Sequence, residues 1–500
     1  MSLPGFQDLK RHRGAFMVSA VSNCASMLFG FDTGVAGAVV ALRSFQTDFN
    51  LGDGGTAKFA AASSNMVALL NAGCFFGALV PALCGHLFGR RHLLAISAFF
   101  LIVGGTIQTA AQPPSMSWMY GGRVIAGFGV GMVSTTVPNY VAECSPKQYR
   151  GLLMGFFEMF LVTGGVLAYW TTYGVSEHLA ETSRQWRVPL SLQIIVSCLI
   201  LVGSSVIVES PRWLAKKDRW EEAESSLCYL RGARPQDEDI VAELADIKAQ
   251  LVRERAATEG REIAELLQKG NLRRLVCGVG VALFSIWTGH NGILYYGPAV
   301  FRQIGYTSQN AALLASGVFT IIKFVCTVLF LLAGVQLLKR THLLTLGGLL
   351  MSVLLYALGA VLKVHPPAPG TAGSPPAQGM MACIYLYVAA YSFSWGPLSW
   401  IYIAEIFPIR IRDYGMAIST MVIWLMNFVV SKITPIAVLN IGWKTWMMYG
   451  TFNIAGCLFA LMIPETKGVA LEDMDVLFGV VEKQRSQVEE GDEEARISKE

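Results

Sequence analysis

Charge is scarce in this sequence. Of its 500 residues, only 15% are charged, whereas 53% are hydrophobic. A soluble protein of this size needs more polar side chains to cover its surface, so the composition excludes a soluble globular protein and indicates a protein of the lipid bilayer. The net charge of +4 comes from basic residues near the ends of apolar runs. It gives no reason to expect a nucleic-acid partner.

The sequence also lacks the patterns of catalytic and metal sites. Its ten cysteines are scattered through apolar runs without paired or metal-type spacing, so we expect small buried side chains. No nucleotide-binding loop, catalytic triad or metal cluster is visible. The apolar run from Gly14 is too long for the core of a cleavable signal peptide. We therefore expect no enzyme, no catalytic residue, no metal and no cofactor.

Apolar runs of about 20 residues are long enough to cross a bilayer as helices. Lys and Arg gather in alternate connections between them, and the positive-inside rule then places both termini in the cytoplasm. We expect an all-α integral membrane protein with twelve transmembrane helices. The runs lie at 15–38, 59–84, 92–111, 118–141, 152–174, 188–208, 275–299, 310–334, 342–363, 380–403, 415–438 and 443–463.

One motif occurs in both halves of the chain. The segment AECSPKQYRG at 142–151 is matched by AEIFPIRIR at 404–412. In each copy an acid is followed by a proline three residues on and by an arginine seven residues on, which gives Glu143 with Arg150 and Glu405 with Arg412. The copies are separated by about half the chain. This duplication suggests two homologous halves packed around a solute path.

The polar segments divide the chain into parts. The segment 209–274 has apolar residues at helical spacing on a charged background, which predicts short amphipathic helices lying against the membrane domain. It is too short for a separate soluble enzyme. We expect a cytoplasmic N-terminus at 1–14, a six-helix bundle at 15–208, a cytoplasmic helical linker at 209–274, a second six-helix bundle at 275–464 and a cytoplasmic, largely disordered tail at 465–500.

A charged residue inside an apolar run is costly and by default marks an ion or solute path. Asp32 lies in the first run, and Arg123 lies at a similar depth in the fourth. A static buried ion pair between them is the alternative. Lys323 lies in the middle of GVFTIIKFVCTVLF. Three environments would accommodate its charge: contact with a solute carboxylate, an ion pair with Glu158 of the fifth run, or an aqueous cavity.

The motifs together resemble those of the sugar porter family of the major facilitator superfamily. The resemblance covers residues 15–478 and implies two six-helix bundles, related by a pseudo-two-fold axis, around one central site that opens alternately to each side. Glu158 in FFEMF, Lys323, FDTGVAGAVVALRSF and WRVPLSLQ are similar to the fungal quinate-permease branch. The family motifs are FGFDTG (29–34), GRR (89–91), GRVIAGFGVG (122–131), AECSPKQYRG (142–151), ESPRWL (209–214), GHNGILYYGP (289–298), GPLSW (396–400), AEIFPIRIR (404–412) and PETKG (464–468).

The resemblance implies roles for the buried charges. In proton-coupled members an acid at the position of Asp32 takes up the proton, and an arginine at the position of Arg123 modulates its proton affinity. Facilitative members tend to carry an amide in place of the acid. Asp32 therefore favours proton coupling in the first half.

The resemblance also implies a solute site, formed mainly by the second half. Where the family usually has two glutamines, this chain has Ser285 and Ile286, which argues against a standard hexose site. A polyhydroxylated acid such as quinate is a candidate beside a monosaccharide or polyol. Ordinary helix packing is the alternative for the aromatic candidates. The candidate solute-binding residues are Glu158, Asn291, Tyr295, Tyr296, Lys323, Trp400 and Asn427.

Charged residues at span ends form a candidate cytoplasmic gate. Ion pairs there would hold the two bundles together in one state and break in the other, and simple anchoring of the span ends is the alternative. The chain departs from the family pattern at His86 and, in the second half, at Gln336 and Lys339. The gate candidates are Arg90, Arg91, Glu143, Arg150, Glu209, Arg212, Glu405, Arg412 and Glu465.

Taken together, the sequence predicts a proton-coupled symporter of a monosaccharide or a related polyhydroxylated solute that works by alternating access. Its partners would be a small polar solute, a proton and the lipid bilayer. We expect a monomer in the plasma membrane. The alternatives are a transport-dead nutrient sensor, and a facilitative carrier or exporter of a cluster metabolite.

Overall fold

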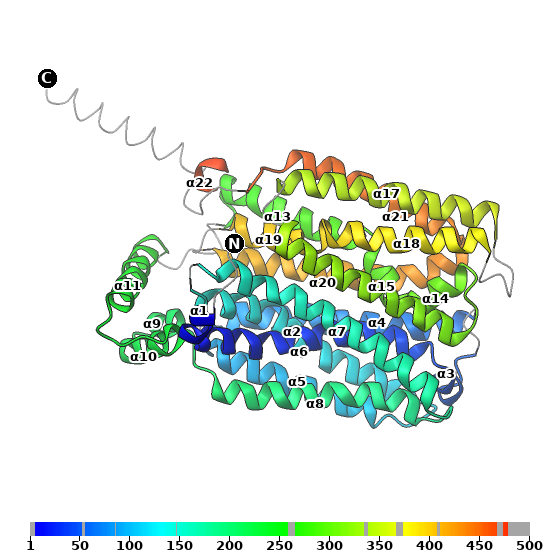
Figure 1. Cartoon of the computed structure of the whole chain (residues 1–500), viewed down its shortest axis with the longest axis horizontal. Coiled ribbons are helices and arrows are strands. Elements are labelled where there is room, and N and C mark those ends of the chain that lie inside the picture. The colour runs from blue at the N-terminus through cyan, green and yellow to red at the C-terminus, as the bar shows by residue number, and fades with distance from the viewer. Residues whose placement is uncertain are drawn as a thin grey trace, which may run out of the picture.

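The computed structural model describes residues 6–52, 56–85, 87–146, 148–258, 266–334, 339–366, 374–407, 411–467 and 474–478. Within these ranges the chain is helical, and long helices run side by side along the longest axis of the molecule (Figure 1). The first-half helices are α1 (Phe6–Arg11), α2 (Arg13–Val40), α3 (Arg43–Asp48), α4 (Ala57–Cys84), α5 (Arg90–Thr109), α6 (Ser117–Cys144), α7 (Arg150–His178) and α8 (Arg184–Val206). The linker contributes α9 (Pro211–Lys216), α10 (Trp220–Arg231) and α11 (Glu238–Thr258). The second-half helices are α13 (Lys269–Trp287), α14 (His290–Gln303), α15 (Gln309–Leu329), the π-helix η1 (Phe330–Gly334), α17 (Arg340–Val364), α18 (Pro375–Ser392), α19 (Trp395–Ile406), α20 (Arg412–Ile441), α21 (Lys444–Met462) and α22 (Met474–Leu477).

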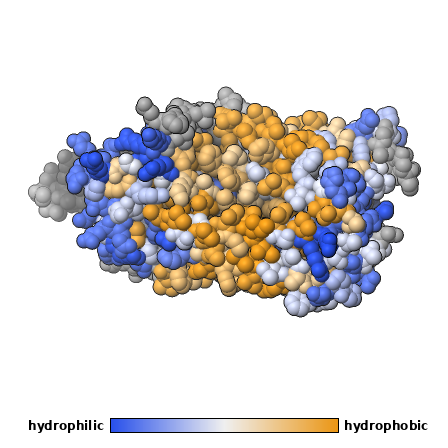
Figure 2. All heavy atoms as spheres, turned by 60° about the horizontal axis from the view of Figure 1, so that its bottom comes forward, coloured by the Kyte–Doolittle hydropathy of each residue, from blue (hydrophilic) through white to orange (hydrophobic). Residues whose placement is uncertain are grey.

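On the face shown in Figure 2, an apolar band crosses the middle of the molecule, and polar residues gather at both ends. By length and composition, 11 helices of the described chain can cross a membrane, with α13 and α14 counted as one. The remaining expected span, 380–403, is formed by α18 and α19, which are separated at Phe393 and Ser394. The break divides this span into two shorter helices. The prediction of an all-α membrane protein with twelve spans is confirmed.

The helices of each half pack mainly on one another. In the first half α2 packs on α7, α4 on α6, and α5 on both α6 and α8; in the second half α17 packs on α18 and α21, and α13 on α20. The halves meet where α4 contacts α20, α7 contacts α15, and α2 contacts α14. Figure 1 shows α9–α11 at one end of the molecule, here called the linker end, and α3 at the other, here called the α3 end.

The linker helices are bound to the linker end of the first half, as their amphipathic pattern predicts. The Trp213 indole of α9 donates to the carbonyl of Gly85 at 2.9 Å. Arg231 at the end of α10 donates to the carbonyl of Cys144 at 2.9 Å and pairs with Glu243 of α11 at 2.7 Å. Because Arg231 satisfies a free carbonyl at the end of α6, the linker completes a membrane helix as well as covering it.

The break between α13 and α14 positions the centre of the second half. Gly289 has φ +94°, and a Cβ there would lie 2.8 Å from the ring of Tyr449, so only glycine fits this turn. The carbonyl of Thr288 accepts from the hydroxyl of Tyr387 and from the amide of Asn453, both at 2.9 Å. Side chains thus satisfy the backbone that the break exposes inside the membrane. As a result, α14 begins at His290, in the interior.

Candidate functional site

Asp32 and Arg123 are brought together in the first half. Both side chains are 0% exposed. The Arg123 Nη1 donates to the Asp32 carbonyl at 2.9 Å and lies 3.4 Å from its Oδ1. Within the described chain, Asp32 Oδ2 and Arg123 Nε and Nη2 have no hydrogen-bond partner. Asp32 lies eight residues from the end of α2, about 12 Å, so the pair is well inside the apolar band.

A cluster of amides and phenols lies where α14 meets α20. The Asn291 amide donates to Asn427 Oδ1 at 2.5 Å, and the Tyr295 hydroxyl donates to the same oxygen at 3.3 Å. Tyr296 instead donates to the carbonyl of Ser431 at 2.6 Å, which ties α14 to α20. Three of the predicted solute-binding residues therefore converge on one point, and Tyr296 has a structural partner.

Trp400 lies near the opposite half. Its ring packs edge-on against Phe157 of α7, with the ring centroids 5.7 Å apart. Phe157 precedes Glu158, so α19 approaches α7 beside the buried acid. This contact between halves accounts for the position of Trp400 by packing alone.

Glu158 and Lys323 lie in opposite halves and form no ion pair with each other. Glu158 is 8% exposed and Lys323 is 6% exposed. Their charges act on one another, yet within the described chain they are not within ion-pair distance. The Lys323 ammonium lies over the ring of Tyr391, with Nζ 5.7 Å from the ring centroid. The direct Lys323–Glu158 pair considered from the sequence is thus not formed in this structure.

Sequence reasoning missed two residues of this centre, His290 and Tyr391. Their rings stack with centroids 3.8 Å apart and planes 8° apart. His290 is 1% exposed, and neither ring nitrogen has a hydrogen-bond partner among the described residues. A signal for His290 was present, because it directly precedes Asn291 in the GHNGILYYGP motif. The sequence holds no such signal for Tyr391, because nothing in an apolar run indicates which aromatic ring packs against another helix.

The acid of each duplicated motif pairs with an arginine in its own half. Arg90 Nη2 lies 3.0 Å from Glu143 Oε1 in the first half, and Arg340 Nη2 lies 3.3 Å from Glu405 Oε1 in the second. Arg340 was absent from the gate candidates. Its position in the sequence indicated this role, because Arg340 follows Lys339 in the second half as Arg90 follows the glycine of GRR in the first. His86 and Gln336, the other departures from the family pattern, lie outside the described residues.

A second pair of acids completes this symmetry. Glu209 accepts from the backbone N–H of Arg91 at 3.2 Å, at the start of α5. Glu465 accepts from the backbone N–H of Arg340 at 2.9 Å and of Thr341 at 3.0 Å, at the start of α17. In both halves, therefore, an acid lies just after the last span of the bundle. It accepts hydrogen bonds from free backbone N–H groups at the start of the third span of the same bundle.

The remaining gate candidates are arginines, and in the part of the chain that the structure describes they form no ion pair with the acid of their own motif. Arg150 Nε is buried without a hydrogen-bond partner in the described chain, and the charge of Arg212 acts on it. Arg412 Nε donates to the carbonyl of Phe407 at 3.2 Å. The ion pairs described at the linker end thus lie within one half or the other.

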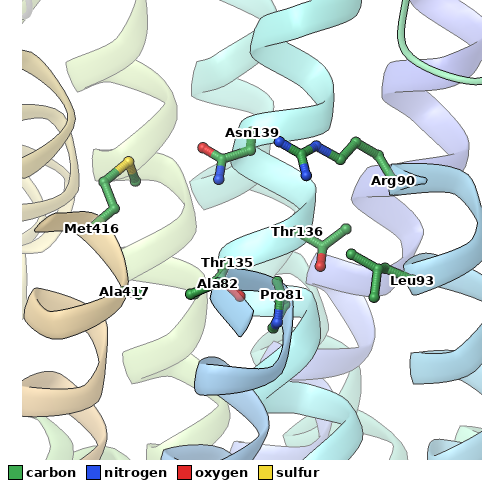
Figure 3. A pocket seen from close by; sticks show the side chains of 9 residues that line it. All are labelled: Pro81, Ala82, Arg90, Leu93, Thr135, Thr136, Asn139, Met416 and Ala417. Atoms are coloured by element: carbon green, nitrogen blue, oxygen red, sulfur yellow. The ribbon is translucent and has the colours of Figure 1, made fainter. Parts of the chain in front are cut away.

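The two ends of the molecule differ in how the halves meet. At the α3 end they are joined by hydrogen bonds: Arg302 donates to the carbonyl of Ala41 at 3.0 Å, and Gln309 donates to Ser176 at 2.7 Å. Toward the linker end a hollow lies between α20 and the first half. Figure 3 shows Met416 on its α20 side and Asn139 on its first-half side. Its lining residues are Pro81, Ala82, Arg90, Leu93, Thr135, Thr136, Asn139, Met416 and Ala417.

The pKa values of the two capping acids, Glu465 and Glu209, are shifted in opposite directions. Burial tends to raise the pKa of Glu465, but the N–H donors of Lys467, Arg340 and Thr341 outweigh it, and the pKa lies below its ordinary value. Burial raises the pKa of Glu209 above its ordinary value. Glu465 therefore favours the folded state most as a carboxylate, whereas Glu209 does so as the neutral acid.

Replacing Glu465 with Gln is expected to lower the thermal unfolding midpoint of the purified protein at pH 7 by roughly 2 °C. A group with a lowered pKa stabilises the fold above its unfolded pKa, about 4.3 for Glu, and that contribution is lost as the pH falls through the folded value. The deficit should therefore shrink below about pH 4. Glu209→Gln is the matched control, with a smaller deficit at pH 7. Equal, pH-independent deficits in both variants would contradict this account.

Comparisons with known proteins agree with this geometry. The sequence profile of the "Sugar (and other) transporter" family matches residues 18–478. A probable quinate permease of Aspergillus clavatus is 34% identical over 472 residues, which cover 93% of this chain and 87% of that protein. The quinate permease of Emericella nidulans is 34% identical over 473 residues, which cover 93% and 88%.

Solved structures give the same picture. The proton:xylose symporter XylE bound to 6-bromo-6-deoxy-D-glucose has a TM-score of 0.77 and 28% identity, with 94% of this chain and 100% of that chain covered. A partially occluded inward-open conformation of the xylose transporter XylE from E. coli has a TM-score of 0.76 and 26% identity, with 92% and 100% covered.

Two six-helix halves around a buried polar centre define a transporter of the major facilitator superfamily. The chain belongs to the sugar transporter family of that superfamily. Because its relatives are permeases and symporters, it is a multi-pass membrane transporter of small polar solutes and not an enzyme, as the sequence predicts.

Proposed function

We propose that this transporter carries a polyhydroxylated carboxylic acid of the quinate kind together with a proton. The observation that carries the proposal is Lys323, a buried ammonium in mid-membrane that has neither a hydrogen bond nor an ion pair within the described chain. An unpaired charge there is costly, and a solute carboxylate would supply the opposite charge. The relatives named quinate permeases support this class, because quinate is a cyclohexane ring with hydroxyl groups and a carboxylate.

The hydroxyl groups of such a solute would meet the amide cluster. Asn291 and Asn427 each offer a donor and an acceptor, which suits hydroxyl groups that do both. Glu158, on the opposite half, can accept from a further hydroxyl. The site then spans both halves, as alternating access around one central solute requires.

Asp32 is proposed to take up the proton, with Arg123 controlling how tightly it is held. The contact between them leaves Asp32 Oδ2 without a partner among the described residues, so one oxygen is free to accept a proton. A static ion pair would more readily use both oxygens in a two-pronged contact with the guanidinium. The one-sided geometry supports coupling over a purely structural pair.

The proton site and the solute site are joined through a close helix contact. A Cβ at Gly37 would lie 1.7 Å from the carbonyl of Tyr295, so α2 and α14 touch backbone to backbone five residues after Asp32. Tyr295 in turn donates to Asn427. A shift of α2 on protonation would therefore move the amide cluster directly, because two helices in backbone contact cannot move independently of each other.

The arrangement of the ends suggests a conformation open toward the cytoplasm. Basic residues concentrate at the linker end, so the positive-inside rule favours that end, and both termini, on the cytoplasmic side. Inter-half hydrogen bonds close the α3 end, whereas the linker-end pairs Arg90–Glu143 and Arg340–Glu405 lie within the halves. In the opposite conformation Arg150 and its counterpart Arg412 would reach acids across the interface and form the cytoplasmic gate.

The two bundles are taken as 15–208 and 275–464, with 209–274 as a cytoplasmic linker that moves with the first half because of the Arg231 and Trp213 contacts. The tail at 465–500 lies mostly outside the described residues. We propose the plasma membrane as the location and a monomer as the working unit.

Uptake of labelled quinate, hexoses, pentoses and polyols tests the proposal. In cells that lack their own porters, quinate is expected to accumulate in the presence of this chain, and to accumulate more when the outside pH is lowered by one unit. Uptake of a hexose or pentose but not of quinate would overturn the acid assignment and favour a neutral sugar, the second candidate, which the amide cluster also fits. Saturable uptake of any solute would exclude a transport-dead sensor.

A further inference from the structure

The strongest unexplained feature of the interior is the imidazole of His290. It is 1% exposed, and neither ring nitrogen has a hydrogen-bond partner within the described chain. Burying such a group without a partner is costly, and in folded proteins buried polar atoms are almost always paired. The His290 ring therefore offers a hydrogen-bond donor and an acceptor whose partners a bound ligand could supply.

The surroundings of His290 fix the orientation of the ring. Its face stacks on Tyr391 of α18 at 3.8 Å between centroids, and it lies within 18° of the plane of Phe319 of α15, at 5.7 Å. Aromatic stacking uses the faces of a ring, so the nitrogens at its edge can form hydrogen bonds only in the plane of the ring. Neighbouring atoms cover both nitrogens in this conformation, so a ligand would reach them in another state of the transport cycle. The backbone is fixed as well, because His290 is the first residue of α14, directly after Gly289.

Lys323 lies against the same aromatic group. It follows Phe319 by four residues on α15, so both side chains share one face of that helix. Its ammonium lies 5.7 Å from the centroid of Tyr391, the ring on which His290 stacks, and its charge acts on His290. The imidazole and the ammonium, each without a hydrogen bond in the described chain, thus lie near the same ring, that of Tyr391.

We infer that His290 and Lys323 together form a two-point carboxylate site, in which Lys323 neutralises the charge and the His290 ring N–H donates to the second carboxylate oxygen. The inference rests on the proposed function, since it assigns the contacts of the acid's carboxylate. An imidazole has at least one N–H donor in every protonation state. Two donors on separate helices fix the plane of a carboxylate, which one ammonium alone does not.

The arrangement also explains how the site would reject neutral solutes. A neutral ring polyol of similar size offers no carboxylate to His290 and Lys323, so both groups would remain buried and unpaired on binding. A site built around polar groups discriminates strongly against a ligand that leaves them unpaired. His290 is thus a specificity residue, distinct from the amide cluster that binds hydroxyls.

Calorimetric titration of the purified full-length protein tests this assignment. His290→Phe keeps the stack on Tyr391 and removes both nitrogens. It is expected to weaken quinate binding by about tenfold or more, the usual cost of one hydrogen bond to a charged group. The quinate methyl ester keeps every hydroxyl but offers His290 only a neutral carbonyl acceptor, so its binding is expected to weaken less, by about fivefold at most. His290→Gln, which retains a donor, should recover part of the affinity.

Stability separates this role from a structural one. Because His290→Phe removes buried unpaired nitrogens, its thermal unfolding midpoint is expected to equal or exceed that of the unaltered protein. Unchanged quinate affinity in His290→Phe would overturn the inference while leaving the proposed function intact. An equal loss for quinate and its ester would also overturn it, because His290 would then act on hydroxyls or on packing. Failure of the unaltered protein to bind quinate would overturn both.

Discussion

Replacing Asp32 with Asn is expected to abolish accumulation driven by pH and to leave exchange of labelled for unlabelled solute intact. Asn has nearly the shape of Asp and keeps an acceptor for Arg123, which lies 3.4 Å from Oδ1, but it cannot take up a proton. The carrier should therefore still bring solute across in both directions. What it should lose is the link between solute and proton.

The size of the effect depends on what crosses with the proton. An acid anion and one proton together carry no net charge, so one unit of pH difference, about 1.4 kcal/mol, sustains about tenfold accumulation. A neutral sugar with one proton carries a charge, and a potential of 100 mV adds about 2.3 kcal/mol, or about fifty-fold. With no membrane potential imposed, Asp32→Asn should in either case bring the ratio of inside to outside concentration to about one. Insensitivity of quinate accumulation to membrane potential would support the acid.

Proteoliposomes with an imposed pH gradient measure both quantities. Asp239→Asn is the matched control, because it makes the same change in an exposed linker pair with Arg11, 2.9 Å apart. It should accumulate solute normally. Full accumulation by Asp32→Asn would remove Asp32 from the coupling role and leave the Asp32–Arg123 contact as a structural pair.

Most of the fold could be predicted from the sequence because a bilayer allows few solutions. Apolar runs of sufficient length must be helices, and their number follows from counting. The broken spans could not be predicted in detail. Gly289 is one glycine among 50, and its break depends on Tyr387 and Asn453 from other helices, whose approach no local pattern contains.

The candidate site was less predictable, for a related reason. Costly residues such as Asp32 and Lys323 stand out in an apolar run whatever their neighbours are. The distances between helices cannot be inferred from an apolar run. The separation of Glu158 from Lys323 and the stacking of His290 on Tyr391 depend on how α7, α14, α15 and α18 pack. Arg340 was visible in the sequence, but its role required the Arg90–Glu143 pair in the other half as a template.

Replacing Lys323 with Gln is expected to remove transport of the acid selectively. A hydrogen bond between charged groups contributes about 1.5–3 kcal/mol, so the KM for quinate should rise about 10- to 150-fold. Gln retains an amide donor, so a neutral solute or the quinate methyl ester should be affected little. Initial rates of uptake for acid and ester over a range of concentrations measure the difference.

The matched control is Lys363→Gln, which removes an exposed lysine that lies 5.0 Å from the ring of Trp443. It should leave both solutes unaffected. Equal loss of acid and ester in Lys323→Gln would indicate that Lys323 holds the helices in place. The structure gives a reason to expect otherwise, because Lys323 makes no ion pair with Glu158 whose loss could disturb the packing. Removing a buried charge that has no protein partner relieves a cost of folding, so the variant should fold at least as well and fail only where the carboxylate needs it.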